Sequence, residues 1–163
     1  MEQFDAYELF GFSKFKRVLL GGRESRIVKS TILHEIGHAY LYQMMIRMRM
    51  DNMEINKEYL NQRSYAGYDM SFGKEFIEEG TSQYLVWSMR ECIMPKMFYK
   101  PDTVEDLLDP YNEYPVKYEY SVCYLRDFYD LHGIKEGMRI LLSNSPPTYE
   151  EILHPKAFFD RLK

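Results

Sequence analysis

The sequence has few cysteines, and it has no long apolar run and no excess of basic residues. Only Cys92 and Cys123 are cysteines among 163 residues, and they form no Cys-x-x-Cys pair, so neither a disulfide framework nor a thiolate metal site is expected. No segment approaches the roughly 18 apolar residues that a transmembrane helix needs. The net charge of −4 is not typical of a nucleic-acid-binding protein. We therefore expect neither a membrane protein nor a nucleic-acid partner.

Proline is absent before Pro95, which leaves the first part of the chain free to form long helices. Apolar residues recur at helical spacing over 25–50 and predict one long helix, whose methionine-rich end is expected to pack in the core. Further helices are expected over 74–92, 117–131 and 134–144, with a short one at the end of 145–159. Residues 15–22 indicate a short strand that ends in a Gly-Gly turn. The predicted fold is mainly α, or α+β with a minimal N-terminal strand region.

The opening residues, MEQFDAYELFGFSKF, contain no basic segment followed by an apolar run. No signal peptide is therefore predicted, and a cytoplasmic location is expected if Met1 is the native start. An apolar share of 45% is typical of a folded chain and not of a disordered one. At this length we expect a single domain over 1–163.

The stretch TILHEIGHAY, residues 31–40, combines two histidines and a glutamate. Residues four apart lie on one face of a helix, so His34 and His38 can bind one tetrahedral zinc ion. Glu35 lies one step round the helix, where it can take a proton from a water that zinc has made more acidic. The alternative is a pair of histidines on the surface or in the core. Gly37 is costly inside a helix, which suggests the close approach of another element.

A catalytic zinc site needs a third protein ligand and an open position. The residues just after His38 are apolar or amide, so the ligand has to come from elsewhere. The segment FIEEGTSQYL, residues 76–85, is the best source, and Glu79 is our candidate there. Glu75 and Glu78 compete with it. Three carboxylates on one helix can also be nothing more than a solvated face.

His34-Glu35-x-x-His38 followed by Glu79-Gly80-Thr81-Ser82 resembles the gluzincins, the HExxH…E zinc peptidases. The resemblance implies a zinc peptidase domain with an active-site helix and a second helix that carries Glu79 as the third ligand. The segment YPVKYEYSVCYL resembles the tyrosine-bearing segment of gluzincin aminopeptidases and of peptidase-MA-like proteins, although Ser121 stands where glycine is usual. In that comparison, Tyr118 takes the position of the catalytic tyrosine, which hydrogen-bonds the developing oxyanion. The alternative for Tyr118 is one more tyrosine of the core or rim.

The ending SPPTYEEILHPKAFF, residues 145–159, resembles the PP-x-T-x-EQ-ILHP-x-x-Y ending of a group of predicted bacterial metalloproteases. This resemblance adds His154 as a residue that assists Tyr118 or orients a ligand. The alternative is a histidine that caps or packs the last helix. Gluzincins usually place a sheet before the HExxH helix, and only about 24 residues precede it here, which leaves the mode of substrate binding open.

We therefore predict a zinc-dependent hydrolase, a peptidase that acts on a peptide or protein substrate. His34, His38 and Glu79 would bind Zn²⁺, Glu35 would serve as base and acid, and Tyr118 would stabilise the oxyanion with His154 as a second group. One alternative is a binding or regulatory module that keeps the gluzincin fold and the zinc without turnover. Another is a helical domain that binds no metal and carries the motif by chance. The sequence does not fix the oligomeric state.

Overall fold

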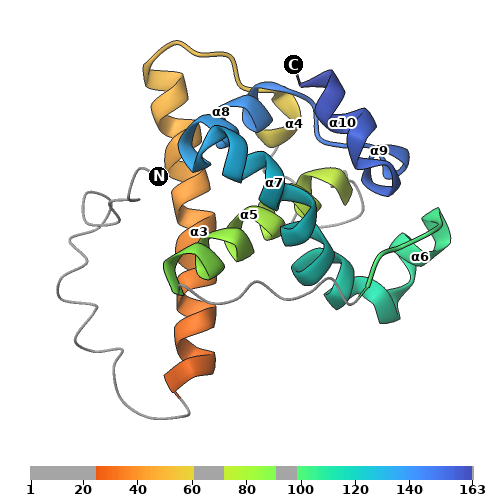
Figure 1. Ribbon diagram of the computed structural model, residues 1–163. Helices are drawn as coiled ribbons and strands as arrows, with labels where there is room; N and C mark the ends of the chain where they lie inside the picture. The colour runs from red at the N-terminus through yellow and green to blue at the C-terminus, as the bar shows by residue number, and fades with distance from the viewer. Residues whose placement is uncertain (1–24, 61–71, 91–98, 163) are drawn as a thin grey trace.

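Residues 25–60, 72–90 and 99–162 are described by the computed structural model. Every regular element in these ranges is helical and none is a strand, so the prediction of a mainly α fold is confirmed for this part of the chain. The strand predicted at 15–22 lies outside the described residues. The elements, labelled as in Figure 1 where space allows, are α3 (Ser25–Met50), α4 (Lys57–Leu60), α5 (Phe72–Arg90), α6 (Val104–Leu108), η2 (Pro110–Asn112), η3 (Pro115–Tyr120), α7 (Ser121–His132), α8 (Ile134–Ser143), α9 (Tyr149–Leu153) and α10 (Pro155–Arg161).

Helix α3 has the bounds that the apolar periodicity predicts, with 26 residues and no proline. Met44 and Met48 are buried as predicted, where their flexible side chains fill the core. Met50, at the end of the same run, is 77% exposed, so the methionine-rich segment is only partly a core segment. None of the described helices has the length and apolar character of a membrane span.

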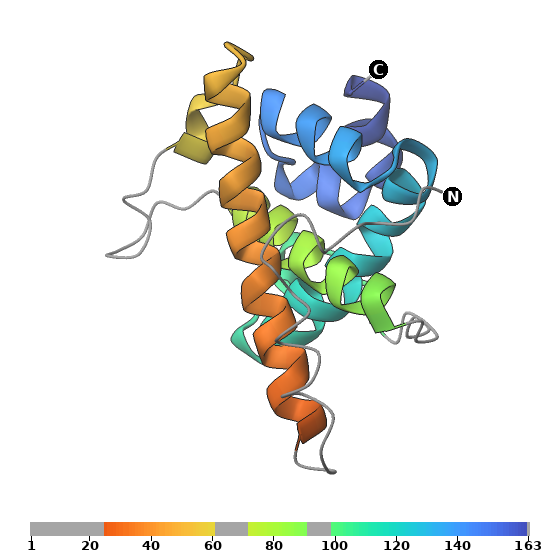
Figure 2. The same cartoon turned by 90° about the vertical axis from the view of Figure 1, so that its left-hand side faces the viewer.

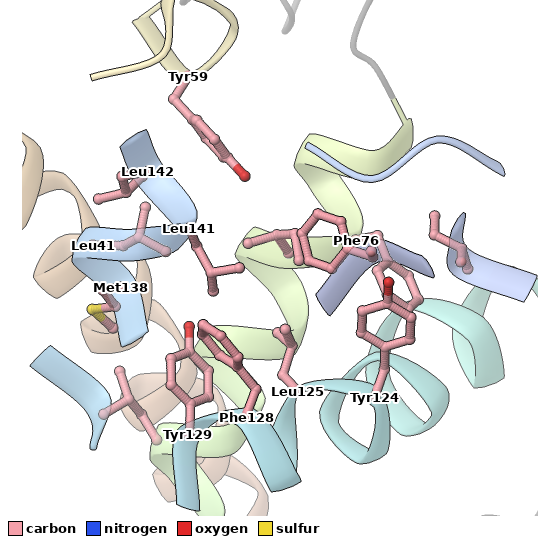
Figure 3. Close-up of a cluster of buried hydrophobic side chains, with 14 of the residues drawn as sticks. Leu41, Tyr59, Phe76, Tyr124, Leu125, Phe128, Tyr129, Met138, Leu141 and Leu142 are labelled. Atoms are coloured by element: carbon pink, nitrogen blue, oxygen red, sulfur yellow. The ribbon is translucent and has the colours of Figure 1, made fainter. Parts of the chain in front are cut away.

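Helix α5 is the centre of the arrangement. It lies across α3 and is covered on its other side by η3 and α7. Helices α8, α9 and α10 lie above α5 in both views (Figures 1 and 2). The largest apolar side chains of these helices meet in one core, to which Phe76, Leu125 and Leu141 contribute fully buried side chains (Figure 3). Full burial of such a side chain contributes about 1.5–3 kcal/mol.

Small residues on α5 allow its neighbours to come close. A Cβ atom added to Gly37 on α3 would lie 2.6 Å from the Cα atom of Ser82, so the prediction that another element approaches Gly37 is confirmed. A Cβ atom added to Gly80 would lie 2.8 Å from the Cβ atom of Ser121. Between these two positions on α5, the side chain of Thr81 is fully buried and shares a hydrogen bond with the hydroxyl of Tyr129. The segment after Glu79 is therefore held between α3 and α7.

The third predicted helix, over 117–131, is not uniform. Residues Pro115–Tyr120 form a π-helical turn, in which the backbone N–H of Ser121 donates to the carbonyl of Val116 five residues earlier. An ordinary α-helix, α7, continues from Ser121 and ends before Gly133, whose φ of 72° suits glycine. Such wide turns are rare and are often found at functional sites.

Candidate metal centre

Three side-chain donors from two helices converge on one point. On α3, Nε2 of His34 lies 3.0 Å from Nε2 of His38. Oε2 of Glu79, on α5, lies 2.9 Å from the first of these nitrogens and 3.6 Å from the second. The four-residue spacing aligns the two imidazoles on α3, and the close contact at Gly37 brings Glu79 within reach.

The size of this triangle suits zinc. A circle through the three atoms has a radius of about 1.9 Å, slightly less than the zinc–nitrogen and zinc–oxygen bond lengths of about 2.0–2.2 Å. His34, His38 and Glu79 could therefore together hold one zinc ion at ordinary bond lengths. Two imidazoles and one carboxylate are also a donor set that catalytic zinc sites use.

The carboxylate of Glu79 is in a state suited to a cation. Its Oε2 atom is buried and faces the two imidazole nitrogens, 2.9 Å from one and 3.6 Å from the other. Burial raises the pKa of the Glu79 carboxyl, but His34 and His38 outweigh that effect and hold the pKa at about 2. Burial lowers the pKa of His38, but the neighbouring carboxylates, Glu79 foremost, raise it overall. Glu79 is thus ionised at neutral pH and directed at the two rings.

Gln83 holds the outer nitrogen of His34. Nδ1 of His34 lies 3.2 Å from Oε1 of Gln83, which is four residues after Glu79 on the same face of α5. With its proton on Nδ1, the imidazole donates to this amide oxygen and presents the lone pair of Nε2 to the centre of the triangle. Metal-binding histidines are commonly held by such a partner. Sequence reasoning missed Gln83, although its spacing from Glu79 would have been a usable signal.

The two competing carboxylates on α5 have other partners. Oε1 of Glu75 lies 2.7 Å from Nζ of Lys117, which also lies 2.7 Å from Glu113. Oε1 of Glu78 lies 3.8 Å from Nζ of Lys74. Of the three glutamates, Glu79 is the one that joins the histidines in a group of potential metal ligands.

Glu35 is exposed on α3, next to His34 in the sequence. Its charge contributes to the raised pKa of His38, after the larger effects of burial and of Glu79. The carboxylate is thus near His38 and does not belong to the group of donors. Its role as base and acid stays a prediction.

Tyr118 lies beside the same group of donors. Its ring centroid is 5.6 Å from that of His34, and the side chain is half-buried. Burial, followed by the negative charge of Glu79, raises the pKa of Tyr118 above its ordinary value, so the phenol keeps its proton at neutral pH. By contrast, Tyr120 is buried on the other side and donates to the carbonyl of Ile152 at 2.7 Å. The two tyrosines, two residues apart, therefore point in different directions.

His154 is exposed at the junction between α9 and α10 and does not belong to the group of donors formed by His34, His38 and Glu79. Two other residues of the C-terminal motif have a structural role. Thr148 and Glu151 form a reciprocal cap at the start of α9. The assignment of His154 as a group that assists Tyr118 or orients a ligand stays a prediction.

A comparison of the chain with protein-family models, with curated proteins and with solved structures found no match.

Proposed function

We propose that this protein is a zinc-dependent hydrolase of the gluzincin type, and that it cleaves peptide bonds in a peptide or protein substrate. One observation carries the proposal: the donor atoms of His34, His38 and Glu79 converge at a spacing that fits a zinc ion. The order HExxH, Glu-Gly and tyrosine along the chain supports the family assignment. The same three residues would hold the ion.

Bound there, zinc would make a water more acidic and polarise a carbonyl group. Glu35 would accept a proton from the attacking water at its carboxylate and then donate it to the nitrogen of the leaving amine. The hydroxyl of Tyr118 would donate a hydrogen bond to the carbonyl oxygen as negative charge develops on it. Gln83 would keep the proton of His34 on Nδ1. The contacts of α5 with both neighbouring helices fix the relative positions of these groups.

The test of this proposal is the Glu35→Gln variant, measured beside the wild type for both zinc content and peptide cleavage. We expect wild-type protein to bind one zinc ion per chain and to cleave peptides from a diverse library. Glu35→Gln should keep the metal and lose cleavage, because the amide cannot take up the proton. Wild-type protein that binds zinc but cleaves no peptide would instead indicate a binding module without turnover. Wild-type protein that binds no zinc would disprove the metal centre.

A further inference from the structure

A row of aromatic rings leads from the candidate metal ligands to the surface. The ring of Tyr118 lies between two others: His34, with ring centroids 5.6 Å apart, and Tyr114, with centroids 5.0 Å apart and planes inclined at 33°. Tyr114 precedes η3 and is 63% exposed. The outer end of the row therefore offers an aromatic surface to solvent beside the candidate active site.

The exposure of Tyr114 contrasts with the tyrosines that hold the fold together. Tyr120, Tyr124 and Tyr129 are buried, and each hydroxyl has a hydrogen-bond partner in Ile152, Glu151 or Thr81. The ring of Tyr114 instead exposes apolar area to water, and covering that area with a bound partner would be favourable. An ordered, exposed aromatic ring next to candidate catalytic groups is the kind of surface that contributes to binding.

The backbone around Tyr114 is held in place by Lys117. Its Nζ atom lies 2.7 Å from Glu75 on α5 and 2.7 Å from Glu113, the residue just before Tyr114. These two ion pairs fix the segment to α5 and also neutralise carboxylates near the row. A side chain that docks on Tyr114 therefore meets a ring that packs on Tyr118, beside carboxylates that Lys117 already pairs.

The distance sets which substrate residue can reach this ring. Ring-to-ring steps of 5.6 Å and 5.0 Å separate Tyr114 from His34, and an extended peptide advances about 3.3–3.6 Å per residue. We propose that Tyr114 forms a substrate subsite, which binds the aromatic side chain of a peptide residue within about three residues of the cleaved bond. This inference rests on the proposed function. A substrate ring would be attracted to the Tyr114 ring in an offset or tilted arrangement, with centroids about 4.5–7 Å apart.

The experiment uses zinc-loaded full-length protein and internally quenched peptides of alanine and glycine, each with one phenylalanine at a successive position. We expect one position near the cleaved bond to raise kcat/KM about three- to tenfold over the alanine peptide, in line with the strength of an aromatic pair. Tyr114→Ala should bring this ratio close to one, and Tyr114→Phe should retain it because the ring is kept. The inactive Glu35→Gln protein should show the same ratio in peptide affinity.

Tyr111→Ala is the matched control, since Tyr111 is a tyrosine of the same connection that is 92% exposed, and it should leave the ratio unchanged. If Tyr114→Ala lowers cleavage of both peptides equally, Tyr114 only positions Tyr118 and the subsite is disproved. A preference for arginine or lysine that depends on Tyr114 would replace the aromatic occupant by a cation and also overturn the proposal. If wild-type protein cleaves no peptide, the proposed function itself fails, whereas cleavage with a ratio insensitive to Tyr114 removes the subsite alone.

Discussion

Nδ1 of His34 lies 3.2 Å from the amide oxygen of Gln83, four residues beyond Glu79 on α5. One helix thus supplies both a candidate zinc ligand and the group that orients another. We expect Gln83→Leu to weaken zinc binding about 10–100-fold, as is typical when such an outer partner is lost, and competition with a chelator measures it. Gln43→Leu is the control, because Gln43 is exposed on α3 and should not affect the metal. Equal zinc affinity in Gln83→Leu and wild type would contradict the role of Gln83.

Glu79→Ala should abolish the stabilisation of the protein by zinc, since the ion would lose its only carboxylate ligand. For a wild-type protein in zinc at about 1,000 times the dissociation constant, that stabilisation is about 4 kcal/mol, and thermal unfolding with and without zinc measures it. Glu78→Ala should keep the effect of zinc. Glu75→Ala should also keep it, while losing some stability through the ion pair with Lys117. If zinc still stabilises Glu79→Ala but not one of the other two variants, the third ligand is misassigned.

Tyr118→Phe should lower kcat by about 10²–10³ while zinc content and melting temperature stay close to wild type, because the lost hydroxyl is proposed to act on charge that exists only in the transition state. Tyr120→Phe should do the reverse. Its hydroxyl donates to the carbonyl of Ile152 in the core, so its removal should cost about 1 kcal/mol of stability and leave the kinetics alone. A larger loss of kcat in Tyr120→Phe than in Tyr118→Phe would show that the oxyanion role is assigned to the wrong tyrosine.

Gly37→Ala should destabilise the protein, although in an isolated helix the same change stabilises by about 1 kcal/mol. The added methyl group would lie 2.6 Å from the Cα atom of Ser82, and overpacking of this kind typically costs about 1–3 kcal/mol. Zinc affinity should fall as well, because α5 would move Glu79 away from the histidines. Denaturant unfolding and zinc titration measure the two effects. Ala39→Gly, at an exposed position of α3, should lose about 1 kcal/mol by propensity alone and keep its zinc affinity; a Gly37→Ala protein more stable than wild type would disprove the close contact.

The parts of the site that lie on one helix could be predicted from the sequence. The relation between His34 and His38 follows from a four-residue spacing in an unbroken helical segment. Gly37 indicated a close contact because glycine there has no other local reason. Glu79 could not be separated from Glu75 and Glu78 in this way, since all three lie on α5. Their distinction depends on how α5 lies across α3, which no local pattern encodes.

The segment around Tyr118 shows another limit of sequence reasoning. Its periodicity predicts one helix over 117–131, whereas the backbone widens into a π-turn over Pro115–Tyr120. That turn ends where Ser121 meets Gly80, a contact between segments about 40 residues apart. A pattern of local apolar spacing contains no information on such a contact. The contact of Tyr118 with His34 joins residues 84 positions apart and depends on how the helices assemble.

The wide turn at Pro115–Tyr120 also has a consequence for the history of such a protein. Deletion of the one residue after Tyr118, Glu119, would restore the ordinary helical pitch and rotate Tyr118 and the residues before it by about 100° relative to α7. The buried face of α7 would stay in place, while Tyr118 would turn away from His34. A descendant with this single deletion would keep its scaffold and its converging donors but lose the phenol beside them. Relatives of this chain that differ by one residue in length at this point are therefore the ones in which to look for divergence of function.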